Sequence, residues 1–144
     1  IGKKSIPYDV IIKEGELTPE EFQLIRKLPS GSRKILNDMK CYSDNILKMA
    51  LEHREKFDGT GYPFQMKGEK ISLYARVVSI MDVFGALTAA RPNRKALTPF
   101  TAVNEMKNNM TGHFDTRILI NFIKILADAA AAKVAPKKTD TANA

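Results

Sequence analysis

Residues 72–88 read SLYARVVSIMDVFGALT and form the most apolar segment of the chain. Ser72 is a typical N-cap residue, and apolar side chains then recur at the three- and four-residue spacing of an α-helix. These side chains are Leu73, Val77, Ile80, Phe84 and Leu87, widened by Val78, Met81 and Ala86. A helix that is apolar almost all round is expected to be central and buried. The sequence therefore predicts a core helix over 73–89.

Other segments carry helical signals of the same kind. In Thr18-Pro19-Glu20-Glu21, Thr18 is the expected N-cap and Glu21 is placed to close a capping box. Leu28–Gly31 is expected to end that helix. Further helices are expected over 31–39 and after Ser43, Thr98 and Asp115, with one helical turn at 9–12. Because no stretch alternates with the period of a strand, the predicted fold class is all-α, a bundle of about six helices.

The composition is that of one ordinary globular domain: 144 residues, 44% hydrophobic and 27% charged. The longest apolar runs are broken by Asp82, Lys124 and Asp128, so we expect no membrane segment. The lone Cys41 cannot form an intrachain disulfide, which favours a cytoplasmic location. The first residue is Ile1 rather than Met, so we expect the chain to be part of a longer protein.

The formal charge of +7 favours an anionic partner: a nucleotide, a nucleic acid or an acidic protein surface. Part of the excess lies in residues 133–144, which are rich in Ala, Lys and Thr and are expected to be a disordered tail after a domain over 1–132. Aromatic and basic residues do not interleave along a face, as single-strand binders require, so nucleic-acid binding is the weakest hypothesis.

Residues 53–63 read HREKFDGTGYP and follow a predicted helix. Gly59 and Gly61 allow a tight backbone path, and Pro63 fixes the exit from the turn. So polar a loop is not core, and loops on a helical scaffold are where binding and catalysis concentrate. We therefore treat this loop as the candidate functional centre.

Several charged residues near this centre have both a structural and a functional interpretation. Asp82 lies in the core helix, where an unpaired carboxylate costs several kcal/mol, so it needs a cation, a metal or donors. His53 is either a structural histidine or a ligand, whereas His113 is expected to be a capping or surface residue. Three cations follow the core helix: Arg91, Arg94 and Lys95. Cations stabilise the C-terminus of a helix whatever their function, but arginines also bind phosphate well.

The order of these residues resembles the HD-GYP domain, a bacterial branch of the HD phosphohydrolases that hydrolyses cyclic di-GMP. The matching segments are His53-x-Glu55-x-x-Asp58-Gly59-x-Gly61-Tyr62-Pro63, Ile71-x-Leu73-x-Ala75-Arg76, Asp82-Val83-Phe84-x-Ala86-Leu87, Arg91-Pro92-x-Arg94-Lys95-Ala96 and Gly112-x-Phe114-Asp115. The resemblance covers residues 1–126 and implies an HD-type helical bundle, here lacking the family's N-terminal helices. It also implies a cluster of iron or manganese ions, which make hydroxide at neutral pH.

The resemblance assigns roles residue by residue. His53 and Asp82 match metal ligands, and Lys3 matches a lysine near the metals and the substrate. The residues that match contacts to the dinucleotide are Tyr62, Arg91 and Arg94. The recognition loop comprises Asp58, Gly59, Gly61, Tyr62 and Pro63.

Two departures predict that the metal site is dismantled, whether or not the family's His-Asp pair precedes this chain. Leu28 stands where the family has a histidine before Pro29, and Arg54 stands where it has a histidine after His53. The His-Asp pair of the family would precede Ile1. Leucine and an always-protonated guanidinium cannot bind a metal, and a divalent site usually needs at least three protein ligands. We therefore expect no metal or a weakly bound one, with Arg54 paired to Asp82.

The leading hypothesis is a divergent HD-GYP module of cyclic di-GMP signalling with weak or no hydrolysis. In this hypothesis it binds the nucleotide or a signalling protein through the recognition loop. The sequence does not decide whether the chain forms a homodimer. The alternatives are an active metal-dependent phosphodiesterase, with its His-Asp pair upstream, and a basic nucleic-acid-binding helical module.

Overall fold

The computed structural model describes residues 6–13, 15–40, 43–90 and 95–134. All regular secondary structure in these ranges is helical, which confirms the all-α fold class. The elements are α1 Tyr8–Ile12, α2 Pro19–Arg26, α3 Leu28–Asp38, α4 Asp44–Glu52, the 3-10 turn η2 Gly68–Lys70, α5 Leu73–Thr88, α6 Pro99–Asn108 and α7 Thr116–Val134. Within the same ranges, no helix is both long enough and apolar enough to cross a membrane.

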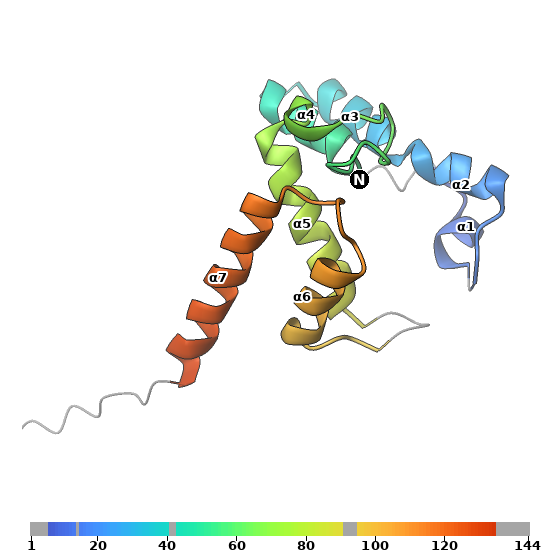
Figure 1. The fold of residues 1–144 in the computed structure, drawn as a ribbon. Helices are drawn as coiled ribbons and strands as arrows, with labels where there is room; N and C mark the ends of the chain where they lie inside the picture. The colour runs from blue at the N-terminus through green and yellow to red at the C-terminus, as the bar shows by residue number, and fades with distance from the viewer. Residues whose placement is uncertain (1–5, 14, 41–42, 91–94, 135–144) are drawn as a thin grey trace, which may run out of the picture.

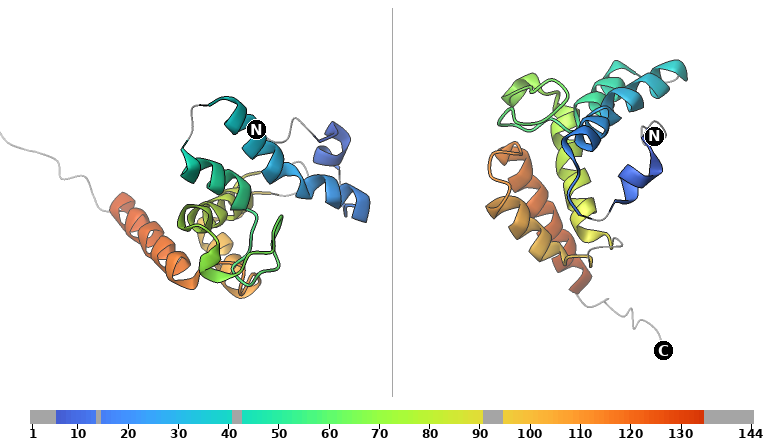
Figure 2. Two further views of the ribbon diagram at one scale, coloured as in Figure 1. Left: turned by 90° about the horizontal axis from the view of Figure 1, so that it is seen from above. Right: turned by 90° about the vertical axis from the view of Figure 1, so that its right-hand side faces the viewer.

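Helix α5 lies at the centre of the arrangement, as Figures 1 and 2 show. It contacts α4, α6 and α7, while α3 packs on α4 and α2 packs on α3. Helices α1 and α2 lie at the side of the molecule away from α7 (Figure 1).

The main core lies between α5, α6 and α7. Met106 and Ala102 of α6 are fully buried there, and Phe84 of α5 meets Phe122 of α7 edge to face with ring centroids 5.1 Å apart. Burying apolar area of this kind stabilises the fold by roughly 25 cal/mol per Å². The other buried members of the core are Ile80, Leu87, Phe114 and Leu119.

The predicted helix starts are confirmed where a polar side chain caps the first turn. Thr18 accepts the N–H of Glu21 at 3.2 Å, and the Glu21 carboxylate accepts the N–H of Thr18 at 2.7 Å, which completes the capping box. Ser72 and Thr98 accept N–H groups in the first turns of α5 and α6. Asp115 accepts the N–H of Arg117 at the start of α7.

Two boundaries differ from the prediction. Helix α3 begins at Leu28 rather than at 31, and only Lys27 separates it from α2. Pro29 is tolerated because it lies in the first turn, where its missing N–H breaks no helical hydrogen bond. Helix α7 runs to Val134, past the predicted start of the tail, and residues 135–144 lie outside the described ranges.

Helix α5 is less buried than the sequence predicts. Leu73, Val77 and Met81 are 54%, 41% and 50% exposed, and they lie on one face because they are four residues apart. The Asp82 side chain is 37% exposed rather than buried. Phe100 of α6 is 76% exposed. The hydrophobic pattern predicted the helices correctly but overestimated how many of their faces pack.

Candidate functional site

The backbone of the loop after α4 is fixed against the turn that precedes α7. The N–H groups of Phe57 and Asp58 donate to the carbonyls of His113 and Gly112, both at 2.9 Å. The N–H of Gly68 in turn donates to the carbonyl of Phe57 at 2.8 Å. Since these bonds join segments far apart in the sequence, the loop is part of the tertiary structure rather than a free connection.

Two buried carboxylates hold the rest of the loop. Glu55 is 3% exposed and accepts the N–H groups of Phe64 at 2.6 Å and Met66 at 3.0 Å. Glu52 is 8% exposed and accepts the N–H of Ser72 at 2.8 Å. Charge-assisted bonds to backbone N–H groups offset the cost of burying a carboxylate. The two side chains therefore fix the path of the chain from α4 to α5.

The turn of the recognition loop has specific backbone requirements. Asp58 accepts the N–H and the hydroxyl of Thr60 at 2.8 and 2.7 Å, an Asx turn. Burial raises the pKa of Asp58, but the bonds from Thr60 outweigh burial and leave the pKa below its ordinary value. Gly59 has φ +90°, and a Cβ added at Gly61 would lie 2.2 Å from the backbone nitrogen of Lys56. Both glycines are therefore required by geometry.

Tyr62 joins the loop to α2. Its ring meets Phe22 edge to face at 6.2 Å, and the Arg26 guanidinium carbon lies 6.0 Å from the ring centroid. Its N–H donates to the carbonyl of Arg54, and the Tyr62-Pro63 peptide bond is cis. Burial raises the pKa of Tyr62, so the phenol keeps its proton at neutral pH.

His53, Arg54 and Asp82 meet beside Tyr62. His53 Nδ1 lies 2.9 Å from the carbonyl of Ala50, which can only accept, so Nδ1 carries the proton and Nε2 is the basic nitrogen. Burial, and after it the charge of Arg54, lowers the pKa of His53. Arg54 Nη2 lies 3.2 Å from Asp82 Oδ2, so the predicted ion pair is confirmed.

Two cavities share Arg54 and Asp82 in their walls. The smaller, of about 120 Å³, is also lined by His53, Tyr62 and His113. The larger, of about 540 Å³, is lined by the ion pair together with apolar side chains from α1, α2, α3, α5 and the turn after α6: Ile11, Ile25, Leu28, Val83, Ala86, Leu87 and Met110. The fold therefore brings Leu28 and Arg54 to one hollow, together with Asp82.

Known proteins resemble this chain in sequence and in fold. The family model described as HD domain matches residues 1–118. A cyclic di-GMP phosphodiesterase of Pseudomonas aeruginosa is 38% identical over 124 residues, which are 86% of this chain and 30% of that protein. In structure, an HDG"Y"P protein of Bdellovibrio bacteriovorus superposes with a TM-score of 0.67 at 18% identity, over 88% of this chain and 40% of that one.

The chain belongs to the HD-GYP family.

Other members resemble it to a similar degree. The response regulator RpfG of Xanthomonas campestris pv. campestris, named as a cyclic di-GMP phosphodiesterase, is 36% identical over 81% of this chain and 31% of its own length. A 3'3'-cGAMP-specific phosphodiesterase of Vibrio cholerae is 34% identical over 82% of this chain and 27% of its own length. The chain thus spans about a third or less of these HD-GYP relatives.

The donors in the described ranges do not form the metal centre that the HD-GYP resemblance implies. No three His, Cys, Asp or Glu side chains in these ranges lie close enough together to hold a metal ion. His53 Nε2 and Asp82 remain as donors, but Asp82 is paired with Arg54. An HD-GYP metal centre therefore does not fit this arrangement of side chains.

The structure does not place every predicted site residue, and the sequence missed some structural ones. Lys3, Arg91 and Arg94 fall outside the described residues. His113, expected to be a capping or surface residue, is half-buried, and its Nε2 lies 3.0 Å from Lys56 Nζ. Burial, followed by the charge of Lys56, lowers the pKa of His113.

The sequence interpretation also missed the internal ion pair of this HD-GYP domain. Arg76 of α5 lies 2.7 Å from Asp115, whose side chain is only 2% exposed. Both residues belong to matched HD-GYP segments, and an arginine inside the apolar pattern of α5 was the available signal. A charged side chain in a buried helix needs a partner of opposite charge, so Arg76 requires a carboxylate partner.

Proposed function

We propose that this chain is a divergent HD-GYP signalling domain that recognises cyclic di-GMP with weak or no hydrolysis. The observation that carries the proposal is the ion pair between Arg54 and Asp82. It places a guanidinium against the carboxylate that matches a metal ligand. Because a guanidinium cannot bind a metal or deliver a metal-bound hydroxide, the pair favours binding over hydrolysis.

The same arginine suits recognition of the ligand. Arg54 has five N–H donors, and the described contact to Asp82 uses one nitrogen. Its remaining donors can bind a phosphate oxygen, for which arginine is well shaped. The larger cavity, about 540 Å³, lies within the roughly 300–1,000 Å³ range of small-molecule sites. We infer that one phosphate of the dinucleotide contacts Arg54, with Arg91 and Arg94 as further candidates.

Tyr62 is the proposed base contact. Phe22 packs against its ring, and it lines the smaller cavity next to the ion pair. A guanine stacked on this ring would be joined to phosphates near Arg54. A signalling protein bound at the loop is the second candidate function. Because one homologue is named as specific for 3'3'-cGAMP, that cyclic dinucleotide is the ligand to compare with cyclic di-GMP.

Replacing Tyr62 with alanine should weaken cyclic di-GMP binding by about 5- to 150-fold, since a base–aromatic stack contributes ~1–3 kcal/mol. Tyr62→Phe keeps the ring and should stay close to the parent affinity. Isothermal titration calorimetry with cyclic di-GMP and 3'3'-cGAMP measures both. Tyr74→Ala is the matched control, because Tyr74 is 53% exposed on α5 and lines neither cavity. Equal affinities for the parent and Tyr62→Ala would refute the assignment.

A further inference from the structure

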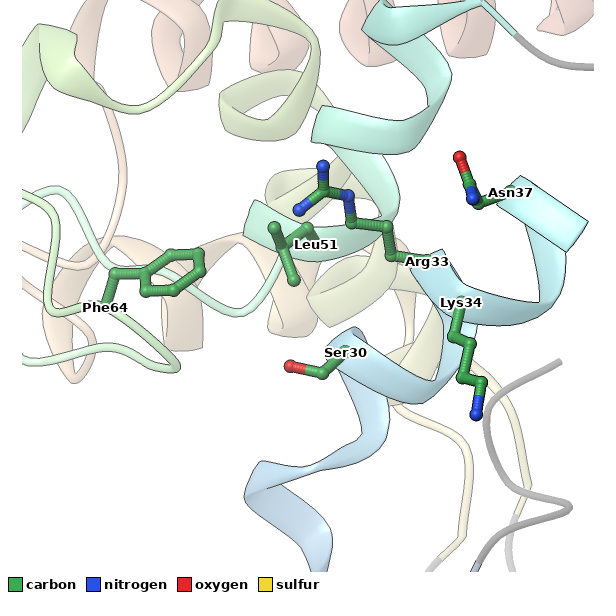
Figure 3. A pocket seen from close by; sticks show the side chains of 6 residues that line it. All are labelled: Ser30, Arg33, Lys34, Asn37, Leu51 and Phe64. Carbon is green, nitrogen blue, oxygen red and sulfur yellow. The ribbon is translucent and has the colours of Figure 1, made fainter.

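A third hollow, of about 350 Å³, lies between α3, α4 and the loop that follows Pro63. It shares no lining residue with the two cavities around Arg54 and Asp82. It is lined by Ser30, Arg33, Lys34, Asn37, Leu51 and Phe64, and Figure 3 shows these side chains. Four polar side chains of α3 line it beside two apolar ones, and its volume falls within the roughly 300–1,000 Å³ range of small-molecule sites.

The apolar part of the hollow is held in place. Leu51 is 7% exposed and forms the floor. Phe64 is 59% exposed, and in Figure 3 its ring points toward Leu51. The N–H of Phe64 donates to the buried Glu55 carboxylate at 2.6 Å, which fixes the backbone that carries the ring. An exposed aromatic ring on a fixed backbone is a surface on which a flat ring can stack.

The polar part is cationic and unpaired. In the described part of the chain, no ion pair or side-chain hydrogen bond involves Arg33 or Lys34. In Figure 3 the Arg33 guanidinium points toward Leu51, while the Lys34 side chain points away from Leu51 and Phe64. None of the six lining residues is acidic. The hollow therefore attracts an anion and has a guanidinium fork ready for it.

We propose that this hollow binds a purine nucleoside monophosphate. The base stacks on Phe64 and covers Leu51, and the phosphate binds Arg33, with Lys34 adding charge at the rim. The hydroxyl of Ser30 and the amide of Asn37 are the polar groups available to the base and sugar. Inorganic phosphate alone would leave the ring and the apolar floor unused, so the ligand needs both an aromatic and an anionic part.

This site is independent of the proposed cyclic di-GMP site, because the two have no residue in common. Either can fail without affecting the other. Titration with GMP, AMP, guanosine and inorganic phosphate, monitored by calorimetry in low salt, tests the second site directly. A saturating concentration of cyclic di-GMP in the calorimeter cell should leave the affinity for GMP unchanged.

Arg33→Ala and Phe64→Leu should each weaken GMP binding at least tenfold. The affinity of Arg33→Lys for GMP should lie between the affinities of Arg33→Ala and the parent. Lys107→Ala, which removes an exposed cation of α6 outside the hollow, is the matched control and should match the parent. Unchanged thermal melts exclude unfolding, since Arg33 and Phe64 are exposed. The proposal is overturned if GMP affinity stays within twofold in both variants, or if inorganic phosphate binds as tightly as GMP.

Discussion

Replacing Asp115 with alanine should lower the free energy of unfolding by about 3–5 kcal/mol, the range found when one partner of a buried ion pair is removed. Its carboxylate lies 2.7 Å from Arg76 Nη1, and the Arg76 side chain is only 13% exposed. Arg76 Nε is already buried without a partner in the described structure. The substitution would therefore leave a charged guanidinium in the interior and also remove the cap of α7.

Urea unfolding followed by circular dichroism measures this effect as a shift of the midpoint. Glu69→Ala is the matched control, because it removes an exposed carboxylate that pairs with Arg117 at 2.7 Å. Exposed pairs contribute about 0–1 kcal/mol, so this variant should unfold near the parent. Similar midpoints for the two variants would show that Asp115 and Arg76 do not form the internal support described above.

Replacing Gly61 with alanine should destabilise the domain by at least about 3 kcal/mol, at or above the upper end of the range for overpacking. The added Cβ would lie 2.2 Å from the Lys56 nitrogen and 2.4 Å from the Glu55 Cα. Both atoms are backbone and cannot rotate away. The recognition loop would have to move, so the proposed binding of cyclic di-GMP should be lost together with stability.

Gly85→Ala is the control for this prediction. Gly85 is exposed within α5, and a Cβ there would meet nothing within 4 Å. Alanine in a helix is favoured over glycine by about 1 kcal/mol, so this variant should be as stable as the parent or slightly more stable. If Gly61→Ala and Gly85→Ala have similar melting temperatures, the loop is not packed as the structure describes.

The sequence predicts the fold well where the signals are local. The capping box of Thr18 and Glu21 and the caps at Ser72 and Thr98 depend on residues within one turn, so spacing alone reveals them. The ion pair of Arg54 with Asp82 was predicted from the expectation that Asp82 is buried; the pair forms although the Asp82 side chain is 37% exposed. Arg54 was the nearest cation that departed from the family pattern.

Features that depend on distant segments could not be predicted in this way. The exposure of Leu73, Val77 and Met81 is decided by which neighbours reach α5, and periodicity does not contain that information. The bonds from Glu55 to the backbone at Phe64 and Met66 likewise appear only once the loop is folded. The hollow between α3 and Phe64 also depends on segments that are far apart in the sequence, so the sequence did not predict it.

The central proposal is that this HD-GYP domain binds cyclic di-GMP through the recognition loop and does not hold the family's metal centre. The most direct measurement is made on the purified 144-residue chain: its metal content by mass spectrometry, together with cyclic di-GMP binding and turnover. We predict cyclic di-GMP binding with no stoichiometric iron or manganese and no linear product. One or more tightly bound iron or manganese ions per chain, with hydrolysis of cyclic di-GMP, would contradict the account.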